Sequence, residues 1–340
     1  THPRMDELAR AGVKVAPYGF GSTRSNNWMG RIQRILPGDQ CPSQPAPGLW
    51  READLVVVNM GGISDGLPWL EHLLTTGRRY AIIVQANMVA FWPNDQLAAR
   101  LRRVYGGACR VFFVSEDNLR LFRIQTAYDG DNARVIWNPM NPKTPEKPIP
   151  WPSSKQPIRL AMVGRVEPFA KGQDLVLEAF ACKELAGLPL EVDIFGSGTW
   201  VETCDLQIRN LGLQSVRMAG SASPSEIWST HHALLMPSRH EGTSLAMLEA
   251  LWLGRPVVST AVAGAIGLIE ENTNGFLIHE PSKDAVVHAL IRLHEARNRL
   301  EAMGSAAARG IRERMPADPA SELANQLLTA ASSAVEGIAH

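Results

Sequence analysis

Residues 233–258 read ALLMPSRHEGTSLAMLEALWLGRPVV, and this stretch decides the fold class. The apolar run at its start predicts a buried strand that ends at Pro237. A polar loop follows, in which Thr243 or Ser244 caps a helix over Leu245–Leu253 that stops at Gly254. A second apolar run comes directly after. Strand, helix and strand in this order are typical of a parallel α/β sheet, whose ligands bind at the carboxyl ends of the strands.

The start of this helix has the properties of a diphosphate site. The first backbone N–H groups of a helix have no partner within it, and the helix dipole favours an anion there. Here those groups belong to Gly242, Thr243, Ser244 and Leu245. Glu241 and Glu249 lie on either side, and their negative charge prevents them from holding the phosphate itself. We expect these carboxylates to accept hydrogen bonds from hydroxyl groups, namely those of a sugar and a ribose.

A second strand with a glycine turn supplies positive charge. It reads LAMVGRVEPFAKG over residues 160–172 and places the turn at Gly164. Arg165 offers a planar fork of donors, and Lys171 offers a compact point charge. Both cations suit a diphosphate whose negative charge grows as it departs as a leaving group.

Short apolar runs recur along the whole chain, with stretches of helical spacing between them. The runs are Val13–Ala16, Leu55–Asn59, Ala81–Gln85, Val111–Ser115, Arg134–Trp137, Leu160–Gly164, Val192–Gly196, Val216–Gly220, Ala233–Ser238, Pro256–Thr260 and Gly275–Ile278. The helical stretches include Arg4–Ala11, Gln96–Tyr105, Asp174–Cys182, Ala285–Arg297 and Ala320–Val335. Because the strand–helix pattern occurs twice, we predict an α/β fold with two doubly wound, Rossmann-like domains that face each other across a cleft.

A proline-rich stretch separates the two sets of runs. Asn138–Pro157 holds seven prolines, which can continue neither a helix nor a central strand. We therefore predict a first domain over residues 1–145, a linker over 146–157, a second domain over 158–318 and a terminal helix over 319–340 that packs back on the first domain. The first domain opens with a helix, so we expect it to be truncated and to lack its first strand and glycine-rich loop.

Composition excludes several classes of protein. The 340 residues carry 34 basic and 34 acidic side chains, and a net charge of zero argues against a nucleic-acid binder. No apolar stretch approaches the roughly 18 residues of a membrane span. Four cysteines without a CxxC pair exclude a disulfide scaffold and a structural zinc site, and they fit a reducing compartment.

Two clusters invite a metal hypothesis, and we reject both. Asp129-Gly130-Asp131 matches a DxD pattern that can hold a metal, but it lies in a polar loop and favours a turn. His231 and His232 have no carboxylate or cysteine partner at ligand spacing. We predict no metal site and no cofactor.

The paired motifs resemble a known family. Gly-Arg at 164–165 and Lys-Gly at 171–172, followed by Glu241 and Glu249 in a Glu-x7-Glu arrangement, look like family 4 glycosyltransferases of the GT-B fold. The resemblance covers roughly residues 107–280 and is weaker before them. It implies transfer of a sugar from a nucleotide-sugar donor with retention of anomeric configuration, without a required metal.

The resemblance also assigns roles by position. Arg165 and Lys171 would bind the donor diphosphate and form the catalytic set with Glu241, which would contact the donor sugar. Glu249 would bind the ribose, and Gly164 with the backbone of residues 242–245 would complete the donor site. Further substrate contacts are expected from Gln85, Asn87, Gly196 and His240.

Two positions depart from the family pattern. Many members carry an aromatic residue and a glycine where this chain has Thr243 and Ser244, so the shape of the donor pocket and the identity of the sugar stay open. Many members have a histidine where this chain has Gln85-Ala86-Asn87, and neither polar side chain is a general base.

The sequence as a whole is interpreted as a retaining glycosyltransferase that moves a sugar from a nucleotide-diphosphate sugar to a hydroxyl of a glycan or glycolipid. Two alternatives stay open: another GT-B enzyme (a sugar phosphorylase or a nucleotide-sugar epimerase), or a truncated nucleotide-binding module without activity. A nicotinamide-dependent dehydrogenase is disfavoured because no GxGxxG with a downstream acidic residue is present.

The place of action is expected to be the cytoplasm, in polysaccharide biosynthesis. Phe91-Trp92-Pro93 and the arginines that follow it form a basic, amphipathic stretch. Such a stretch can lie on anionic lipid, which would suit a lipid-linked acceptor at the inner face of the membrane. A helix with a solvated arginine face is the commoner explanation.

Overall fold

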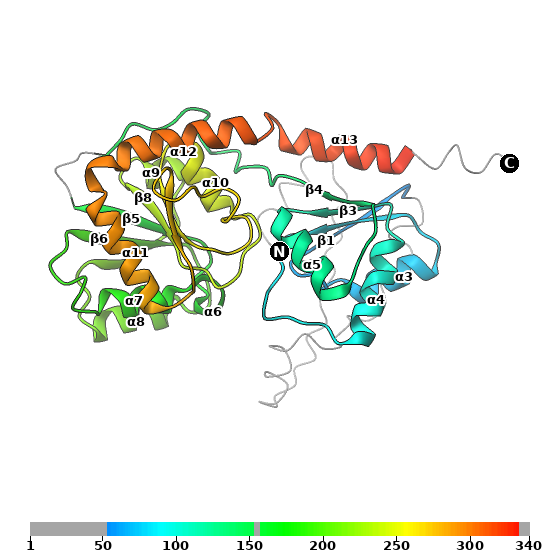
Figure 1. The fold of residues 1–340 in the computed structure, drawn as a ribbon, viewed down its shortest axis with the longest axis horizontal. Helices are drawn as coiled ribbons and strands as arrows, with labels where there is room; N and C mark the ends of the chain where they lie inside the picture. Colours follow the sequence, from blue (N-terminus) through cyan, green and yellow to red (C-terminus); the bar gives the residue numbers. More distant parts are fainter. Residues whose placement is uncertain (1–52, 153–156, 333–340) are drawn as a thin grey trace.

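The computed structural model describes residues 53–152 and 157–332, which form two α/β units, each built on one parallel sheet (Figure 1). The first sheet has the order β1-β2-β3-β4 and the second has the order β10-β9-β8-β5-β6-β7. Every recorded strand pair is parallel. The predicted α/β class with two doubly wound units is therefore confirmed.

The first unit alternates strands and helices. Its elements are β1 (Val56–Met60), α3 (Leu67–Thr75), β2 (Tyr80–Val84), α4 (Asp95–Gly106), β3 (Arg110–Phe113), α5 (Glu116–Thr126) and β4 (Ala133–Val135). All residues of β2 are buried, as expected of a strand covered on both faces. The side chains of Asn94 and Ser115 accept hydrogen bonds at the starts of α4 and α5, which explains where these helices begin.

The second unit is larger. Its strands are β5 (Ile158–Val163), β6 (Leu190–Phe195), β7 (Val216–Gly220), β8 (Ala233–Met236), β9 (Val257–Thr260) and β10 (Gly275–Ile278). Its helices are α6 (Pro168–Lys171), α7 (Gln173–Phe180), α8 (Val201–Asn210), α9 (Pro224–Trp228), α10 (Leu245–Trp252), α11 (Lys283–Glu295) and α12 (Leu300–Arg314), with a short 3-10 helix at Arg297–Arg299. Separate apolar clusters cover the two faces of its sheet.

The order of strands in the second sheet creates a switch point. The chain runs outward from β5 through β6 to β7, then returns to place β8 against the other side of β5. From β8 it continues in the opposite direction to β9 and β10. The loops after β5 and β8 therefore diverge on opposite faces and leave a crevice at their carboxyl ends.

The predicted strands in the described residues are all present, with ends that differ by at most two residues. The predicted helix Asp174–Cys182 is observed as Gln173–Phe180, and Leu245–Leu253 as Leu245–Trp252. The strand predicted at Val13–Ala16 and the helix at Arg4–Ala11 lie outside the described residues.

The proline-rich stretch crosses from the first unit to the second with no helix or strand among its described residues. It is anchored along the way: the indole N–H of Trp252 donates to the Pro145 carbonyl, and Arg255 donates to the carbonyls of Ile149 and Pro150. The segment therefore packs on the second unit and does not act as a free tether.

The last helix, α13 (Pro319–Ser332), returns to the first unit. The Arg79 guanidinium donates to the carbonyls of Ala330 and Ala331, and Leu323 and Leu327 pack on a small apolar cluster of the first sheet. Figure 1 shows α12 and α13 following each other along one side of both units. None of the described helices is long and apolar enough to cross a membrane.

Candidate functional site

Two loops meet at the crevice between β5 and β8. The loop after β5 carries Gly164, Arg165 and α6 with Lys171, and the loop after β8 leads through Glu241 to α10. Gly172, with φ of +77°, lies so close to the Pro237 carbonyl that a Cβ there would overlap it. This close approach brings the end of α6 against the end of β8.

Lys171 and Glu241 form an ion pair at this junction. Lys171 Nζ lies 2.6 Å from Glu241 Oε1, and the Ser238 hydroxyl donates to the same oxygen at 2.9 Å. Glu241 is only 8% exposed. From the sequence, Lys171 is expected to bind the diphosphate and Glu241 to contact the sugar. The structure places the two side chains in direct contact.

Arg239 links the loop after β8 to the segment that follows β5. Its guanidinium makes a two-pronged ion pair with Asp174, and its backbone N–H donates to the Ala170 carbonyl. A third bond from the guanidinium reaches the Pro168 carbonyl. A bidentate arginine–carboxylate pair has a fixed geometry, so α6 is held in register with the loop that carries Glu241.

The start of α10 keeps its backbone N–H groups available. Ser244 is the N-cap residue, but its side chain makes no capping hydrogen bond. Within the described part of the chain, no hydrogen bond is recorded from the backbone N–H groups of residues 242–245. The expected side-chain cap is therefore wrong in its detail, because the Thr243 hydroxyl donates instead to the Val114 carbonyl of the first unit.

Glu249 lies one helical turn inside α10 and is 8% exposed. Burial raises its pKa to about 7, against hydrogen bonds from the Thr144 hydroxyl and the backbone of Asn141 that favour the ionised form. Thr144 Oγ1 lies 3.5 Å from Glu249 Oε1. The crossover between the units thus lines the side of the site where the ribose is predicted.

Arg165 lies apart from the Lys171–Glu241 pair. Its side chain is 74% exposed, and its Nη1 lies 3.1 Å from Glu167 Oε2. Gly164 adjoins the aliphatic part of Lys171, since a Cβ there would lie 3.7 Å from Lys171 Cε. Gly196 touches the backbone of Gly164, which leaves no room for a side chain and gives this glycine a packing role.

His240 stacks edge-on with the ring of Phe169, whose side chain is largely exposed. The ring centroids are 5.6 Å apart. Burial lowers the pKa of His240, with Glu241 acting in the opposite direction. The imidazole is therefore neutral at neutral pH, beside the ion pair and not part of it.

The first unit reaches the site through Gln85. Gln85 follows β2, and its carbonyl lies where a Cβ of Gly242 would be. The loop between β8 and α10 therefore touches this strand end directly. Its side-chain amide donates to Asn59 Oδ1 at 3.1 Å. Asn87 is buried, where it donates to Gln125 and accepts from the backbone of Met88. The side chain of Asn87 holds its own loop in place.

The two histidines rejected as metal ligands have structural partners. His231 Nε2 lies 3.0 Å from Asp193 Oδ2, and His232 Nδ1 accepts from the Arg159 backbone. Asp193 also pairs with the guanidinium groups of Arg159 and Arg217. In the described ranges, no group of three or more His, Cys, Asp or Glu side chains could hold a metal ion.

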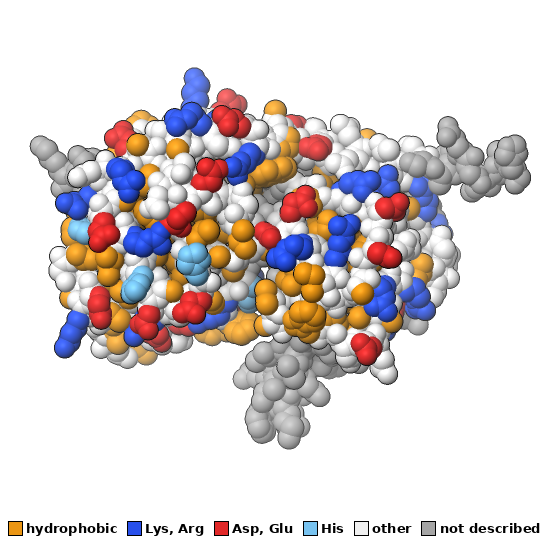
Figure 2. Space-filling view, in the orientation of Figure 1, with side chains coloured by type: hydrophobic (Ala, Val, Ile, Leu, Met, Phe, Trp, Pro, Cys, Tyr) orange, Lys and Arg blue, Asp and Glu red, His pale blue; other side chains and the backbone are white. Residues whose placement is uncertain are grey.

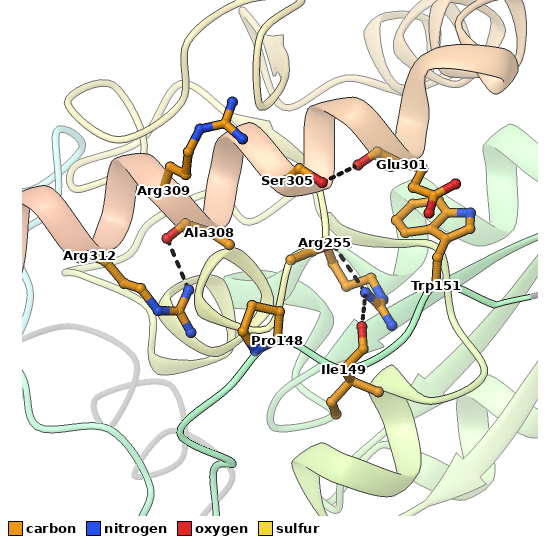
Figure 3. Close-up of a pocket in the computed structure, with 10 residues that line it drawn as sticks. Pro148, Ile149, Trp151, Arg255, Glu301, Ser305, Ala308, Arg309 and Arg312 are labelled. Carbon is orange, nitrogen blue, oxygen red and sulfur yellow. Dashed lines mark hydrogen bonds between the residues drawn. The ribbon is translucent and has the colours of Figure 1, made fainter.

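A groove of about 430 Å³ lies elsewhere, between the crossover segment and α12 (Figure 3). Arg255 forms its floor, and all the recorded hydrogen bonds of this guanidinium go to backbone carbonyls. Gly254 follows α10 and precedes β9. The groove therefore lies at the amino ends of the strands, whereas Glu241 lies at their carboxyl ends. This groove is a packing seam and not the candidate site.

Sequence reasoning missed several residues that complete the site. Ser238 bonds Glu241, Asn138 donates to the Thr243 carbonyl at 3.3 Å, and Gly264, with φ of +81°, packs against Gly242 and Thr243. Only Ser238 carried a local signal, because it lies three residues before Glu241 on the same loop. The other two come from distant segments.

The surface is mixed in charge. Figure 2 shows acidic and basic side chains interspersed over the visible face, with no continuous basic area on it.

Comparison with known proteins links this geometry to an enzyme class. Residues 143–310 match the family described as glycosyl transferases group 1. Among curated proteins, the chain is 30% identical over 150 residues to the amylovoran biosynthesis glycosyltransferase AmsK of Erwinia amylovora, which covers 41% of this chain and 37% of that protein. It is 28% identical over 167 residues to the lipopolysaccharide 1,6-galactosyltransferase of Salmonella typhimurium, covering 47% and 45%. The chain thus spans less than half the length of these relatives.

Among solved structures, HepE of Anabaena in complex with UDP-glucose superposes with a TM-score of 0.66 at 18% identity, over 81% of this chain and 79% of that one. At this identity the likeness establishes the fold, which is GT-B. The chain is therefore similar in sequence to glycosyltransferases over less than half of its length, and its fold is GT-B.

Proposed function

We propose that this chain transfers a sugar from a nucleoside-diphosphate sugar to a hydroxyl of a glycan or lipid-linked glycan acceptor, with retention of anomeric configuration and without a required metal. The observation that carries this proposal is the start of α10. Its first backbone N–H groups, which bond to none of the described residues, lie between two buried carboxylates, Glu241 and Glu249, with Lys171 in contact with the first. An anion flanked by two hydroxyl-bearing rings matches this order of groups.

Each group has a part in the proposed reaction. The bond between the anomeric carbon and the diphosphate oxygen breaks, and its electron pair stays on the diphosphate. The α10 N–H groups and Lys171 stabilise the charge that develops there. The acceptor oxygen then attacks the anomeric carbon from the same face, and the departing phosphate oxygen takes its proton.

Domain contact supports a role for the first unit as well. Gln85 and Val114 follow neighbouring strands of the first sheet, and both touch the donor loop at Gly242 and Thr243. An acceptor bound at these strand ends would lie next to the sugar. Contact of this kind also excludes water from the reacting centre, which limits hydrolysis of the donor.

In this proposal, Arg165 exchanges its partner Glu167 for the diphosphate when the donor binds. Its exposed guanidinium is paired with Glu167 on the loop before α6. An exposed pair of this kind is weak, so a diphosphate can compete for the arginine. Peripheral association with a membrane through the stretch that begins at Phe91 stays a prediction.

The test is thermal stabilisation by UDP, GDP, ADP, dTDP and NAD, each on the wild type and on Glu249→Ala. A ligand at 100 times its dissociation constant adds about 2.7 kcal/mol to the free energy of unfolding. We expect one nucleoside diphosphate to stabilise the wild type and to lose most of that effect in the variant. Stabilisation by none of them in the folded chain would overturn the donor site.

A further inference from the structure

The two oxygens of the Glu241 carboxylate have different surroundings. Oε1 accepts from Lys171 Nζ at 2.6 Å and from the Ser238 hydroxyl at 2.9 Å. Within the described part of the chain, no hydrogen bond or ion pair reaches Oε2. One oxygen is thus saturated by the protein, and the other is available to a ligand.

Ser238 is itself held firmly. It is fully buried, and its carbonyl accepts a hydrogen bond from the Thr260 hydroxyl at the end of β9. The carbonyl of the preceding residue, Pro237, lies directly against Gly172. The Ser238 hydroxyl therefore comes from a fixed point between two strand ends, whereas Lys171 reaches the carboxylate on a flexible stem.

A glutamate side chain with several rotatable bonds loses conformational entropy when a ligand fixes it. Two donors on one oxygen remove that freedom beforehand, and binding then costs less. We propose that Ser238 is a positioning residue of the donor-sugar site: with Lys171 it fixes Glu241 so that Oε2 faces a hydroxyl of the transferred sugar. This inference rests on the proposed function, because it names how that site recognises the sugar part of the donor.

Removal of the Ser238 hydroxyl tests its positioning role without removing the ion pair between Lys171 and Glu241. In Ser238→Ala, Glu241 keeps its ion pair with Lys171, so no buried charge is left without a partner. The carboxylate is then held only by Lys171, on its flexible stem. We expect the affinity for a nucleotide sugar to fall roughly tenfold, as for loss of one hydrogen bond to a charged group. The affinity for the nucleoside diphosphate alone, which lacks the sugar, stays unchanged.

Ser259→Ala is the matched control. Ser259 is fully buried on β9, and its hydroxyl donates to a neighbouring backbone carbonyl at 2.9 Å. The chemical change and the burial equal those at Ser238, but Glu241 is not its partner. A general loosening of the second unit would affect both variants in the same way.

By calorimetry, UDP and UDP-glucose, GDP and GDP-mannose, ADP and ADP-glucose, and dTDP and dTDP-glucose are each titrated into the wild type, both alanine variants and Ser238→Cys. We expect the preference for the nucleotide sugar over its diphosphate to drop in Ser238→Ala, to drop less in Ser238→Cys and to persist in Ser259→Ala. In a Glu241→Gln background, Ser238→Ala should change that preference little, because the two residues act as a unit.

The outcomes separate the two proposals. A wild type that binds none of these compounds would overturn the proposed function. A wild type that prefers the nucleotide sugar, with the same preference in Ser238→Ala, would overturn the role of Ser238 alone. Equal affinity of the wild type for both members of each pair would also overturn that role, since Glu241 would then make no sugar contact to be positioned.

Discussion

The Thr243 hydroxyl donates a hydrogen bond to the main-chain carbonyl of Val114, which belongs to the other α/β unit. One residue earlier, Gly242 lies directly against the carbonyl of Gln85. The loop that forms the start of α10 is therefore also the surface on which the first unit closes. Occupancy of the proposed donor site and contact between the two units therefore involve the same residues.

Closure of the two units depends on the absence of a side chain at Gly242. A Cβ there would overlap the Gln85 carbonyl, so Gly242→Ala should hold the units apart. Small-angle scattering should detect a larger radius of gyration, and turnover should fall at least about tenfold because the site stays open to water. Gly267→Ala, whose Cβ would meet nothing within 4 Å, should match the wild type. Scattering curves that coincide for Gly242→Ala and the wild type would contradict this account of the interface.

The ion pair between Lys171 and Glu241 also contributes to stability. Lys171→Met leaves a carboxylate in a site where Glu241 is 8% exposed, and we expect a loss of about 1–3 kcal/mol in the free energy of unfolding. Lys171→Met combined with Glu241→Gln should recover part of that loss. Lys283→Met, which removes an exposed lysine paired with Asp284, should change stability by less than about 0.5 kcal/mol. Urea unfolding measures all three, and equal effects at Lys171 and Lys283 would show that the buried pair makes no special contribution.

Glu249 should make stability depend on pH. Burial raises its pKa to about 7, so the folded chain binds a proton that the unfolded chain has released at that pH. The stability it contributes is full below the ordinary carboxyl pKa of about 4.5 and is lost as pH rises through about 7. At 1.36 kcal/mol per pKa unit, the loss is about 3 kcal/mol. Glu249→Gln should therefore be more stable than the wild type at pH 8 and show a flatter profile between pH 5 and 8. A parallel profile in the variant would refute this assignment.

Nucleotide affinity should also depend on the ionisation of Glu249, but it should rise with pH where stability falls. Ribose hydroxyls donate to a carboxylate, so the bound state favours ionised Glu249 and its binding releases a proton below pH 7. We expect affinity to rise with pH between about 6 and 8 in the wild type. Because phosphate groups titrate in the same range, Glu249→Gln is the reference, and the difference between the two profiles is the quantity to measure. Identical profiles would place the ribose elsewhere.

Arg255 should be the anchor of the crossover segment. Its buried guanidinium donates to carbonyls of Ile149 and Pro150 on that segment and of Trp228 and His231 on the sheet side. Arg255→Met leaves these carbonyls without donors, and we expect a loss of about 2–4 kcal/mol by urea unfolding. Arg309→Met, an exposed arginine at the same groove, should cost less than about 0.5 kcal/mol. Equal losses would mean that the groove, and not the carbonyl bonds, determines the effect.

Local pattern alone located most of the elements. The apolar runs at Ala81–Gln85 and Ala233–Ser238 predict buried strands, and the structure has buried strands there, at Tyr80–Val84 and Ala233–Met236. The helix that follows Ser244 and ends near Gly254 was predicted for the same local reasons, which are capping chemistry and apolar spacing. The predicted side-chain cap is wrong, because Ser244 makes no capping hydrogen bond and the Thr243 hydroxyl donates to a carbonyl of the other unit.

Chain order cannot say which loops meet, and the tertiary structure decided this. The amino-acid sequence by itself determined two α/β units, a glycine turn before Arg165 and two carboxylates spaced along one loop and helix. The placement of β8 beside β5 put Lys171 against Glu241, and the packing of the crossover segment on the second unit brought Thr144 to Glu249. Burial, which raises the pKa of Glu249, likewise depends on what packs around it. Secondary structure follows from neighbours in the chain, whereas a site is made of side chains that are neighbours only in space.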